Sequence, residues 1–400
     1  MINIIGLGYI GLPTALMLAA NGNNVIGTDI DKEIISSLSK GEVLFPEDGL
    51  MKLFTEACKK GIRFSNKVEK ADVYIIAVPS PYDSQSKKVD MTFIISAFEN
   101  VMHTCPDNAT IVIESTISPG SIDRAIRPLN CKNIHLAHAP ERIIPGNMIY
   151  ELKRNARTIG VDDLETGELL SKIYGSFCEG EIVLTDIKTA EMTKVIENTY
   201  RDINIAFANE LAKICRYGGM NVYEIIRIAN KHPRVNILRP GPGVGGHCIA
   251  VDPWFLVGDY PGLANIILSA RKINDSMPEF ILARIREIIA VENITDIMRV
   301  GIYGLTYKEN VDDTRLSPSL QLLECMRKHL APALKCYDPR VNKRIVENQY
   351  FSFEDFVIDI DMIIIMTAHD DIKNKQSYLT DKVILDTHNI LQKGSHVYGL

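Results

Sequence analysis

The chain has 400 residues, of which 46% are hydrophobic and 24% are charged, and its formal net charge is −6. This length is too great for one ordinary hydrophobic core and predicts two or three domains. The mildly acidic balance argues against nucleic-acid binding, so an anionic ligand would have to be met by local Arg and Lys side chains. The eight cysteines form no CxxC pair and no metal-ligand spacing, which predicts a reducing cytoplasm and no metal site.

Two features argue against export and membrane insertion. A strand-like segment, 2–5, follows the first residue at once and leaves no room for a signal peptide. Apolar runs such as 362–366 are far shorter than the ~20 residues of a membrane-spanning helix. We therefore expect a cytoplasmic protein that does not associate with membranes.

The N-terminal segment carries a dinucleotide-binding fingerprint. Residues 2–5 predict a buried strand, a helix runs to about residue 21, and a second strand, 24–27, leads to Asp29. Between the first strand and the helix, Gly6, Gly8 and Gly11 form a GxGxxG turn, which lets a pyrophosphate approach the backbone at a helix N-terminus. Asp29 would bind the ribose hydroxyls and repel a 2′-phosphate, which favours NAD over NADP. A glycine turn without a ligand is the alternative.

Three more predicted strands end in polar segments that contain proline. They are 72–78, 110–113 and 134–139, and the polar residues that follow them include Ser80, Thr116, Glu141 and Arg142. Ligands bind beyond the carboxyl ends of the strands in open α/β sheets, so these four side chains are candidates for one cleft. Taken singly, each is better explained as a turn residue than as a ligand contact.

The middle of the chain predicts a long helix over about 189–216, where apolar residues recur at spacings of three and four. Its length would be roughly 40 Å. Lys194, Asn198 and Arg201 would share one face of this helix, as substrate contacts or simply as a solvated stripe. Shorter helical patterns at 222–230 and 279–291 predict a helical segment packed on the long helix.

A glycine-rich loop, 241–253, precedes the second of these shorter helices. Four glycines come before Cys248, His247 lies beside the thiol, and Asp252 follows four residues later. Glycine lets backbone N–H groups approach an anion, and a thiol with such donors and a carboxylate nearby is typical of a nucleophilic site. The alternative is a mobile loop with a buried, inert cysteine.

The C-terminal third predicts a second α/β sheet. Strand patterns at 299–304, 334–337, 362–366 and 383–385 accompany a helix near 318–329. No GxGxxG turn follows the first of these strands, so this sheet should not bind a second dinucleotide in the same manner.

Taken together, the motifs resemble those of the UDP-glucose/GDP-mannose dehydrogenase family over the entire chain. The residues that carry the resemblance are the GxGxxG turn, Glu114-Ser115-Thr116, Ala139-Pro140-Glu141-Arg142, Glu191-Met192-Thr193-Lys194 with Asn198, Gly243 to Cys248, Tyr307-Lys308, and Asp312-Asp313-Thr314-Arg315. The resemblance implies two Rossmann-like doubly wound domains joined by a helical segment with a long central helix. The expected division is an NAD-binding domain at 1–188, a helical dimerisation domain at 189–296 and a UDP-sugar-binding domain at 297–400.

The same resemblance implies an NAD-dependent, four-electron oxidation of a sugar C6 alcohol to a carboxylate, with two NAD consumed by a homodimer. Val251 and Glu114 stand where UDP-glucose members usually have lysine, and the segments 200–206 and 232–236 are similar to the N-acetylhexosamine branch. The expected substrate is UDP-N-acetyl-D-mannosamine, with UDP-N-acetyl-D-glucosamine and UDP-glucose as alternatives. Two positions depart from the family pattern: Ser80 replaces a threonine, and His388 replaces a basic residue near the diphosphate.

Roles are carried over from the family by position. Cys248 would hold the sugar as a thiohemiacetal and then a thioester, Lys194 and Asp252 would handle the alcohol proton, and Glu141 would activate the hydrolytic water. The expected NAD contacts are Gly6, Gly8, Tyr9, Ile10, Gly11, Asp29, Ser80, Thr116 and Arg315. The expected contacts to the UDP-sugar are Arg142, Ile143, Lys194, Asn198, Arg201, His232, Arg234, Gly245, Tyr307 and Lys308, with Arg234 supplied across the dimer interface.

Two other functions remain open from the sequence. A single-step NAD-dependent hydroxyacid dehydrogenase would share the N-terminal fingerprint and would need no thiol. An NAD-binding sensor without catalysis would keep Asp29 and the glycines but would need no polar face on the long helix. The yield of NADH per substrate separates the three: two, one and none.

Overall fold

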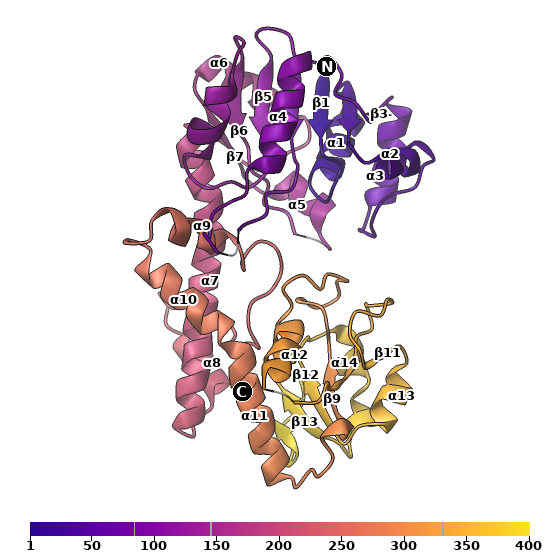
Figure 1. The fold of residues 1–400 in the computed structure, drawn as a ribbon, viewed down its shortest axis with the longest axis vertical. Coiled ribbons are helices and arrows are strands. Elements are labelled where there is room, and N and C mark those ends of the chain that lie inside the picture. Colours follow the sequence, from indigo (N-terminus) through magenta and orange to yellow (C-terminus); the bar gives the residue numbers. More distant parts are fainter. Residues whose placement is uncertain (84, 145, 330) are drawn as a thin grey trace. The chain divides into compact units, whose positions relative to one another are not determined.

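The computed structural model describes residues 1–83, 85–144, 146–329 and 331–400. The chain forms two compact units, Met1–Glu197 and Asn198–Leu400, and Figure 1 shows the elements of each. The boundary falls inside the 31-residue helix α7, Ile187–Tyr217. This helix covers the predicted span 189–216, while the three-part domain division stays a prediction.

The first unit is built on an eight-stranded sheet in the order β3-β2-β1-β4-β5-β6-β7-β8. In that order the strands are Arg63–Ser65, Val25–Thr28, Ile2–Ile5, Val73–Ile76, Thr110–Ile113, His135–His138, Arg157–Val161 and Ile182–Thr185. The first six are parallel, whereas β7 runs antiparallel to β6 and pairs in parallel with β8. The order reverses between β1 and β4, and ligands bind at such a point in doubly wound sheets.

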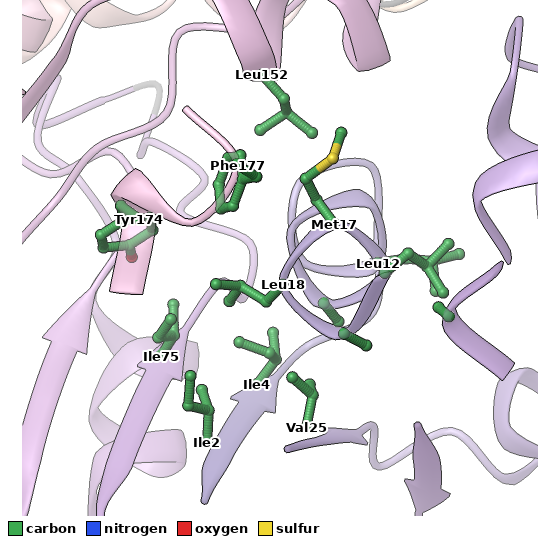
Figure 2. Close-up of a cluster of buried hydrophobic side chains, with 14 of the residues drawn as sticks. Ile2, Ile4, Leu12, Met17, Leu18, Val25, Ile75, Leu152, Tyr174 and Phe177 are labelled. Atoms are coloured by element: carbon green, nitrogen blue, oxygen red, sulfur yellow. The ribbon is translucent and has the colours of Figure 1, made fainter. Parts of the chain in front are cut away.

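Helices cover both faces of this sheet. One face packs against α1, Gly11–Ala20, α3, Leu50–Lys59, α5, Met148–Arg154, and α6, Leu164–Gly175. The other packs against α4, Thr92–Thr104, and a π-helix at Ile122–Ile126. Figure 2 shows Leu18 of α1 above Ile4 and Ile75 of the strands, with Leu152 of α5 nearby. Successive strand residues point to opposite faces, so a sheet covered on both sides needs the continuous apolar runs that the sequence shows. Helix α2, Lys32–Ser39, completes the unit.

The second unit begins with helices and ends with a sheet. Its helices before the sheet are α8, Val222–Ala229, α9, Asp252–Asp259, α10, Asn265–Asp275, and α11, Met277–Val291. The sheet has the order β11-β10-β9-β12-β13-β14 and is parallel throughout. Its strands, in that order, are Gln349–Tyr350, Lys335–Tyr337, Val300–Tyr303, Met362–Ile365, Val383–Asp386 and Val397–Tyr398. Helices α12, Pro318–Lys328, α13, Phe353–Ile358, and α14, Asp370–Asn374, pack on it.

When its strands are numbered along the chain, the C-terminal sheet has the same strand order as the first six strands of the N-terminal sheet. This confirms the predicted fold class of two Rossmann-like doubly wound sheets with a long central helix. No helix in the described ranges is long and apolar enough to cross a membrane.

A buried polar network holds α10 against α7. The guanidinium of Arg271 lies 2.5 Å from the Asp202 carboxylate, and Asn274 donates to the same carboxylate at 2.8 Å. Asn274 also accepts from the Asn209 side-chain amide at 2.9 Å, while Asn209 Oδ1 accepts the Gly241 N–H at 2.9 Å. The network therefore anchors the start of the glycine-rich loop that leads to Cys248.

Candidate active site

The three glycines of the N-terminal turn are required for different reasons. Gly6 has φ +91°, and a Cβ there would lie 2.8 Å from the Ala77 carbonyl oxygen, while a Cβ on Gly11 would overlap the Gly6 carbonyl. Both are therefore needed by the fold itself. A Cβ on Gly8 would meet nothing within 4 Å in the described chain. The protein does not fill this space, and an approaching pyrophosphate can use it.

The carboxylate of Asp29 is fixed at the end of β2. One oxygen accepts the Leu7 N–H at 2.8 Å and the other accepts the Asp31 N–H at 2.9 Å. Next to the turn, the Tyr9 ring stacks on Phe45 with centroids 4.3 Å apart. The turn and the acidic side chain are thus held together, as binding of a dinucleotide ribose requires.

The residues after β4 and β5 lie at neighbouring strand ends. Ser115 donates to the Val78 carbonyl oxygen at 2.6 Å, which ties these two ends together. Ser80 is buried and Thr116 is half-buried beside them. Glu191 of α7 accepts N–H groups from Gly120 and Ile122, so the first turns of α7 are fixed to the segment that follows Thr116.

Glu141, after β6, belongs to a buried charge cluster. Its carboxylate contacts the Arg157 guanidinium and accepts the Arg142 N–H at 2.6 Å. Arg157 also pairs with Glu114 at 3.0 Å. Burial raises the pKa of Glu114 to about 7, against the opposing effect of Arg157. The candidate base therefore lies against a cation that two carboxylates share.

The other predicted residues of the first unit face inward. Arg142 donates to the Ala156 carbonyl at 2.8 Å and to Thr158 at 2.7 Å, and it pairs with Glu197 at 3.0 Å. Ile143 is part of the hydrophobic core. Lys194 is buried on α7. The part that these residues play in substrate binding stays a prediction.

In the second unit, the glycine-rich loop packs flat against the segment after β9. A Cβ on Gly245 would lie 2.7 Å from the Tyr307 Cβ, and one on Gly246, where φ is +82°, would lie 2.8 Å from the Tyr307 ring. The Gly246 N–H donates to the Arg315 carbonyl at 2.9 Å. Only glycine allows this approach, and it brings Tyr307 and Arg315 to the cysteine loop.

Cys248 is exposed and leads directly into α9. Its carbonyl oxygen accepts the N–H groups of Val251 at 3.0 Å and Asp252 at 2.9 Å. The buried Asp252 carboxylate accepts from Asn198 at 2.5 Å, and Asn198 in turn accepts from the Arg201 guanidinium. The structure therefore connects Asn198 and Arg201 of α7 with Asp252, four residues beyond the thiol.

Charged groups surround the loop on its other side. Arg315 is held by Asp313 through contacts of 3.0 and 2.6 Å. Burial, Asp313 and Cys248 raise the pKa of Tyr307 to about 12, so its hydroxyl stays protonated. Burial and the Arg315 charge lower the pKa of His247, so this imidazole is neutral at neutral pH.

Two predicted contacts, His232 and Arg234, and the departure at His388 have a different setting. His232 and Arg234 lie exposed after α8, where the Arg234 N–H donates to His232 Nδ1 at 3.3 Å. His388 is 3.0 Å from the Met366 carbonyl through Nε2, and burial lowers its pKa. At this position the chain therefore has a neutral side chain bonded to its own backbone, in place of the family's basic residue.

The comparisons with known proteins agree with this geometry. Three domain descriptions of one family match in order: its NAD binding domain at residues 1–178, its central domain at 188–276 and its UDP binding domain at 301–393. The chain belongs to the UDP-glucose/GDP-mannose dehydrogenase family. It is an NAD-dependent nucleotide-sugar dehydrogenase, and the free space at Gly8 with the fixed Asp29 carboxylate fits that cofactor.

Several similar proteins of this family are named for oxidation of UDP-N-acetyl-D-mannosamine. A UDP-N-acetyl-D-mannosamine dehydrogenase of Methanocaldococcus jannaschii is 46% identical over 98% of this chain and 92% of its own. The Escherichia coli enzyme of that name is 38% identical over 86% of each chain. Among solved structures, the UDP-D-ManNAc dehydrogenase of Pyrococcus horikoshii has a TM-score of 0.92 at 36% identity, covering 100% of this chain and 99% of its own.

Two further residues hold the segment that contains Tyr307 and Lys308, and the sequence alone did not single them out. Asp338, at the end of β10, accepts the N–H groups of Leu305 at 2.6 Å and Thr306 at 3.0 Å. His369 accepts the Asn310 N–H at Nδ1, 2.9 Å away, and its Nε2 lies 3.2 Å from Asp338. Asp338 stands where Asp29 stands in the first sheet, so an acidic residue after the second strand was an available signal.

The same Asp338 argues against a second dinucleotide site of the N-terminal kind in the C-terminal sheet. The carboxylate that would meet a ribose is fully buried and faces His369. Gly304, with φ +93°, repeats the position of Gly6, but no GxGxxG turn follows it. The C-terminal sheet thus keeps the first glycine and the acidic residue of the fingerprint, but the carboxylate of that acidic residue bonds to groups of the protein itself.

Proposed function

We propose that this protein oxidises the C6 alcohol of UDP-N-acetyl-D-mannosamine to the uronate and consumes two NAD in doing so. The observation that carries the four-electron reaction is the exposed Cys248, joined by a short turn to the buried Asp252–Asn198–Arg201 network. A one-step alcohol dehydrogenase needs no thiol. The names of similar proteins and the residues Val251 and Glu114 support the mannosamine substrate.

The chemistry proceeds in two stages. NAD, when bound, accepts a hydride from C6 in each oxidation. In the first, Asp252 or Lys194 receives the proton of the C6 hydroxyl, directly or through water, and an aldehyde forms. The Cys248 thiolate then adds to the aldehyde carbon, and the resulting thiohemiacetal is aligned for loss of the second hydride. Lys194 offsets the negative charge on the oxygen.

Hydrolysis completes the reaction. The second oxidation leaves a thioester between the sugar C6 and Cys248. Glu141 takes a proton from water, whose oxygen attacks the thioester carbon, and the C–S bond breaks to return the thiolate. One alcohol, two NAD and one water give one carboxylate, two NADH and three protons. Release of a carboxylate makes the sequence irreversible.

The residues that bind the nucleotide sugar and NAD are assigned by their position in the family pattern. We assign Arg142, Ile143, Lys194, Asn198, Arg201, His232, Gly245, Tyr307 and Lys308 to the UDP-sugar, and Ser80, Thr116 and Arg315 to NAD alongside the GxGxxG turn. The chain matches a UDP binding domain at residues 301–393. The position of Tyr307 and Lys308 at the carboxyl end of β9 supports their assignment, because ligands bind there in such sheets.

A homodimer with shared sites is the final part of the proposal. Tyr200, Phe207 and Ile214 follow one another at intervals of seven residues on α7 and are 67%, 49% and 53% exposed. Seven residues are close to two helical turns, so they form one apolar stripe. Exposed apolar surface of this kind marks protein–protein contact, and a second copy of the chain is the partner we assign to it.

The test is a panel of nucleotide sugars with NAD. UDP-N-acetyl-D-mannosamine should give two NADH per sugar and a uronate, with kcat/KM above those for UDP-N-acetyl-D-glucosamine, UDP-N-acetyl-D-galactosamine and UDP-glucose. Preference for the glucosamine or galactosamine sugar would overturn the epimer while leaving the chemistry. One NADH per sugar would overturn the four-electron reaction, and no NADH with any sugar would return the chain to the class of NAD-binding sensors.

A further inference from the structure

Arg157 is an uncommon residue for its position. It begins β7 in the interior of the first unit and is 4% exposed. Its two terminal nitrogens point to different carboxylates: Nη1 lies 3.0 Å from Glu114, and Nη2 contacts Glu141. Its guanidinium also lies 4.2 Å from the centroid of the Tyr174 ring. A buried charge without partners is very costly, so both carboxylates and the ring are part of the reason why arginine is tolerated here.

The two carboxylates differ in what else holds them. Glu114 follows β5 and is fully buried, with the Tyr174 hydroxyl 3.4 Å away on α6. Burial favours its protonated form and raises its pKa to about 7. Glu141 follows β6, at the edge of the sheet where ligands bind. A protonated Glu114 leaves the positive charge of Arg157 to Glu141.

Both carboxylate oxygens of Glu141 are therefore held by neighbouring groups of the first unit. Oε1 accepts the Arg142 N–H at 2.6 Å, and Oε2 contacts Arg157. A general base must be ionised and correctly aimed, and a neighbouring cation within contact distance favours the ionised form. The fork of an arginine can meet two carboxylates at once, whereas a lysine ammonium is a single point charge.

We propose that Arg157, supported by Glu114, is a positioning residue that holds the Glu141 carboxylate aimed for hydrolysis of the Cys248 thioester. This inference rests on the proposed function. Arg157 neither gives nor takes a proton: the proton of water goes to Glu141, the water oxygen bonds to C6, and the C–S bond breaks. Without Arg157, Glu141 would lose the contact at Oε2 and its carboxylate would be free to turn.

The test separates hydrolysis from the oxidations that precede it. Arg157→Met, mixed with saturating UDP-sugar and NAD, should give a burst of two NADH per subunit at a near wild-type rate. Steady turnover should then be at least about 10-fold slower, as for a base that is misplaced rather than absent. Intact mass after an acid quench should show the sugar acyl group on Cys248. Hydroxylamine attacks thioesters without a base and should restore turnover, which a generally damaged protein would not show.

Matched variants complete the design. Glu114→Gln retains an oxygen for Arg157 and should keep steady turnover within about 3-fold of wild type, because the neutral form of Glu114 suffices. Arg157→Lys retains the charge without the fork, so its steady turnover should fall between those of wild type and Arg157→Met while its burst of NADH stays near the wild-type rate. This variant also keeps the inference testable if Arg157→Met does not fold.

Two patterns overturn the inference and leave the proposed function intact. One is an Arg157→Met burst slowed as much as its steady rate, with no acyl group on Cys248. The other is a steady turnover of Arg157→Lys equal to that of wild type. Glu141→Gln is the reference for the function itself, since it should accumulate the acyl group on Cys248 strongly. No acyl group in Glu141→Gln would instead contradict the thioester and the proposed function together.

Discussion

At the scale of single residues, the glycine turn separates the needs of the fold from those of the ligand. Gly11→Ala would place a Cβ on the Gly6 carbonyl and should destabilise the first unit by about 3 kcal/mol or more. Gly8→Ala meets no described atom and should change stability by less than about 0.5 kcal/mol. It should nevertheless weaken NAD binding at least about 10-fold, because its methyl group takes the space of the pyrophosphate. Urea unfolding and NAD titration measure the two effects, and unchanged NAD affinity in Gly8→Ala would contradict the assignment.

Asp29 tests the choice of cofactor. Asp29→Asn keeps an acceptor for a backbone N–H but loses the charge that we assign to the ribose contact. A hydrogen bond to a charged group is worth about 1.5–3 kcal/mol, so NAD affinity should fall roughly 10- to 100-fold while NADP binds relatively better. The control is Asp31→Asn, which removes a charge two residues away and still caps α2. Equal NAD to NADP ratios for wild type and Asp29→Asn would refute the ribose contact.

Short-range patterns made part of the site predictable. Gly6, Gly8 and Gly11 lie within a few residues of each other, and so do Cys248 and the glycines before it. Asp338 and His369 contact residues 31 or more positions away, and Arg157 reaches back to Glu114 across 43. Such pairs are set by the order of strands in the sheet, which local patterns do not contain.

At the scale of elements, local patterns likewise decided which strands could be predicted. Val73–Ile76 and Met362–Ile365 are fully buried and apolar throughout, as parallel strands covered on both faces must be. Strand β7 was not predicted because it begins with the charged Arg157. β3 and β8 lie at the two edges of their sheet, where exposed and half-buried residues leave a weak pattern.

The ends of β5 and β6 carry two groups whose titrations oppose each other. His138 is fully buried with Nδ1 bonded to the Ile113 carbonyl at 2.8 Å, and burial lowers its pKa from 6.5 to about 3. Below pH 6.5 the unfolded chain gains a proton there that the folded chain does not, so this group removes stability as pH falls. Burial raises the pKa of Glu114 from 4.5 to about 7, so the folded chain gains the proton first and this group adds stability from pH 7 down to 4.5.

Between pH 6.5 and 4.5 the two effects offset each other, with slopes of up to about 1.4 kcal/mol per pH unit each. Glu114→Gln should therefore lose stability more steeply than wild type across this window, and His138→Asn should lose less or gain. Urea unfolding followed by circular dichroism at four pH values measures both slopes. Curves that run parallel for all three proteins would contradict the two burial effects.

At the scale of the whole molecule, the proposed dimer predicts that two inactive variants regain activity when they are mixed. Arg234→Ala should lose most activity while staying folded and dimeric, because the exposed Arg234 is assigned to the partner's site. Cys248→Ala should be inactive in uronate formation. Mixed dimers of the two would hold one site with both a thiol and an arginine, so activity should recover to about a quarter of wild type at equal mixing, since half of the dimers are mixed and each has one complete site. Mixtures that never exceed either parent would exclude a shared site.

The central claim is that Cys248 carries the sugar between the two oxidations. The direct measurement is the product and NADH yield of Cys248→Ala, with Cys58→Ala, another exposed cysteine, as the control. Cys248→Ala should bind UDP-N-acetyl-D-mannosamine normally, oxidise it slowly to the aldehyde and stop at one NADH per sugar, because the loss falls after the first step. Uronate formed at a near wild-type rate, with two NADH per sugar, would contradict the account.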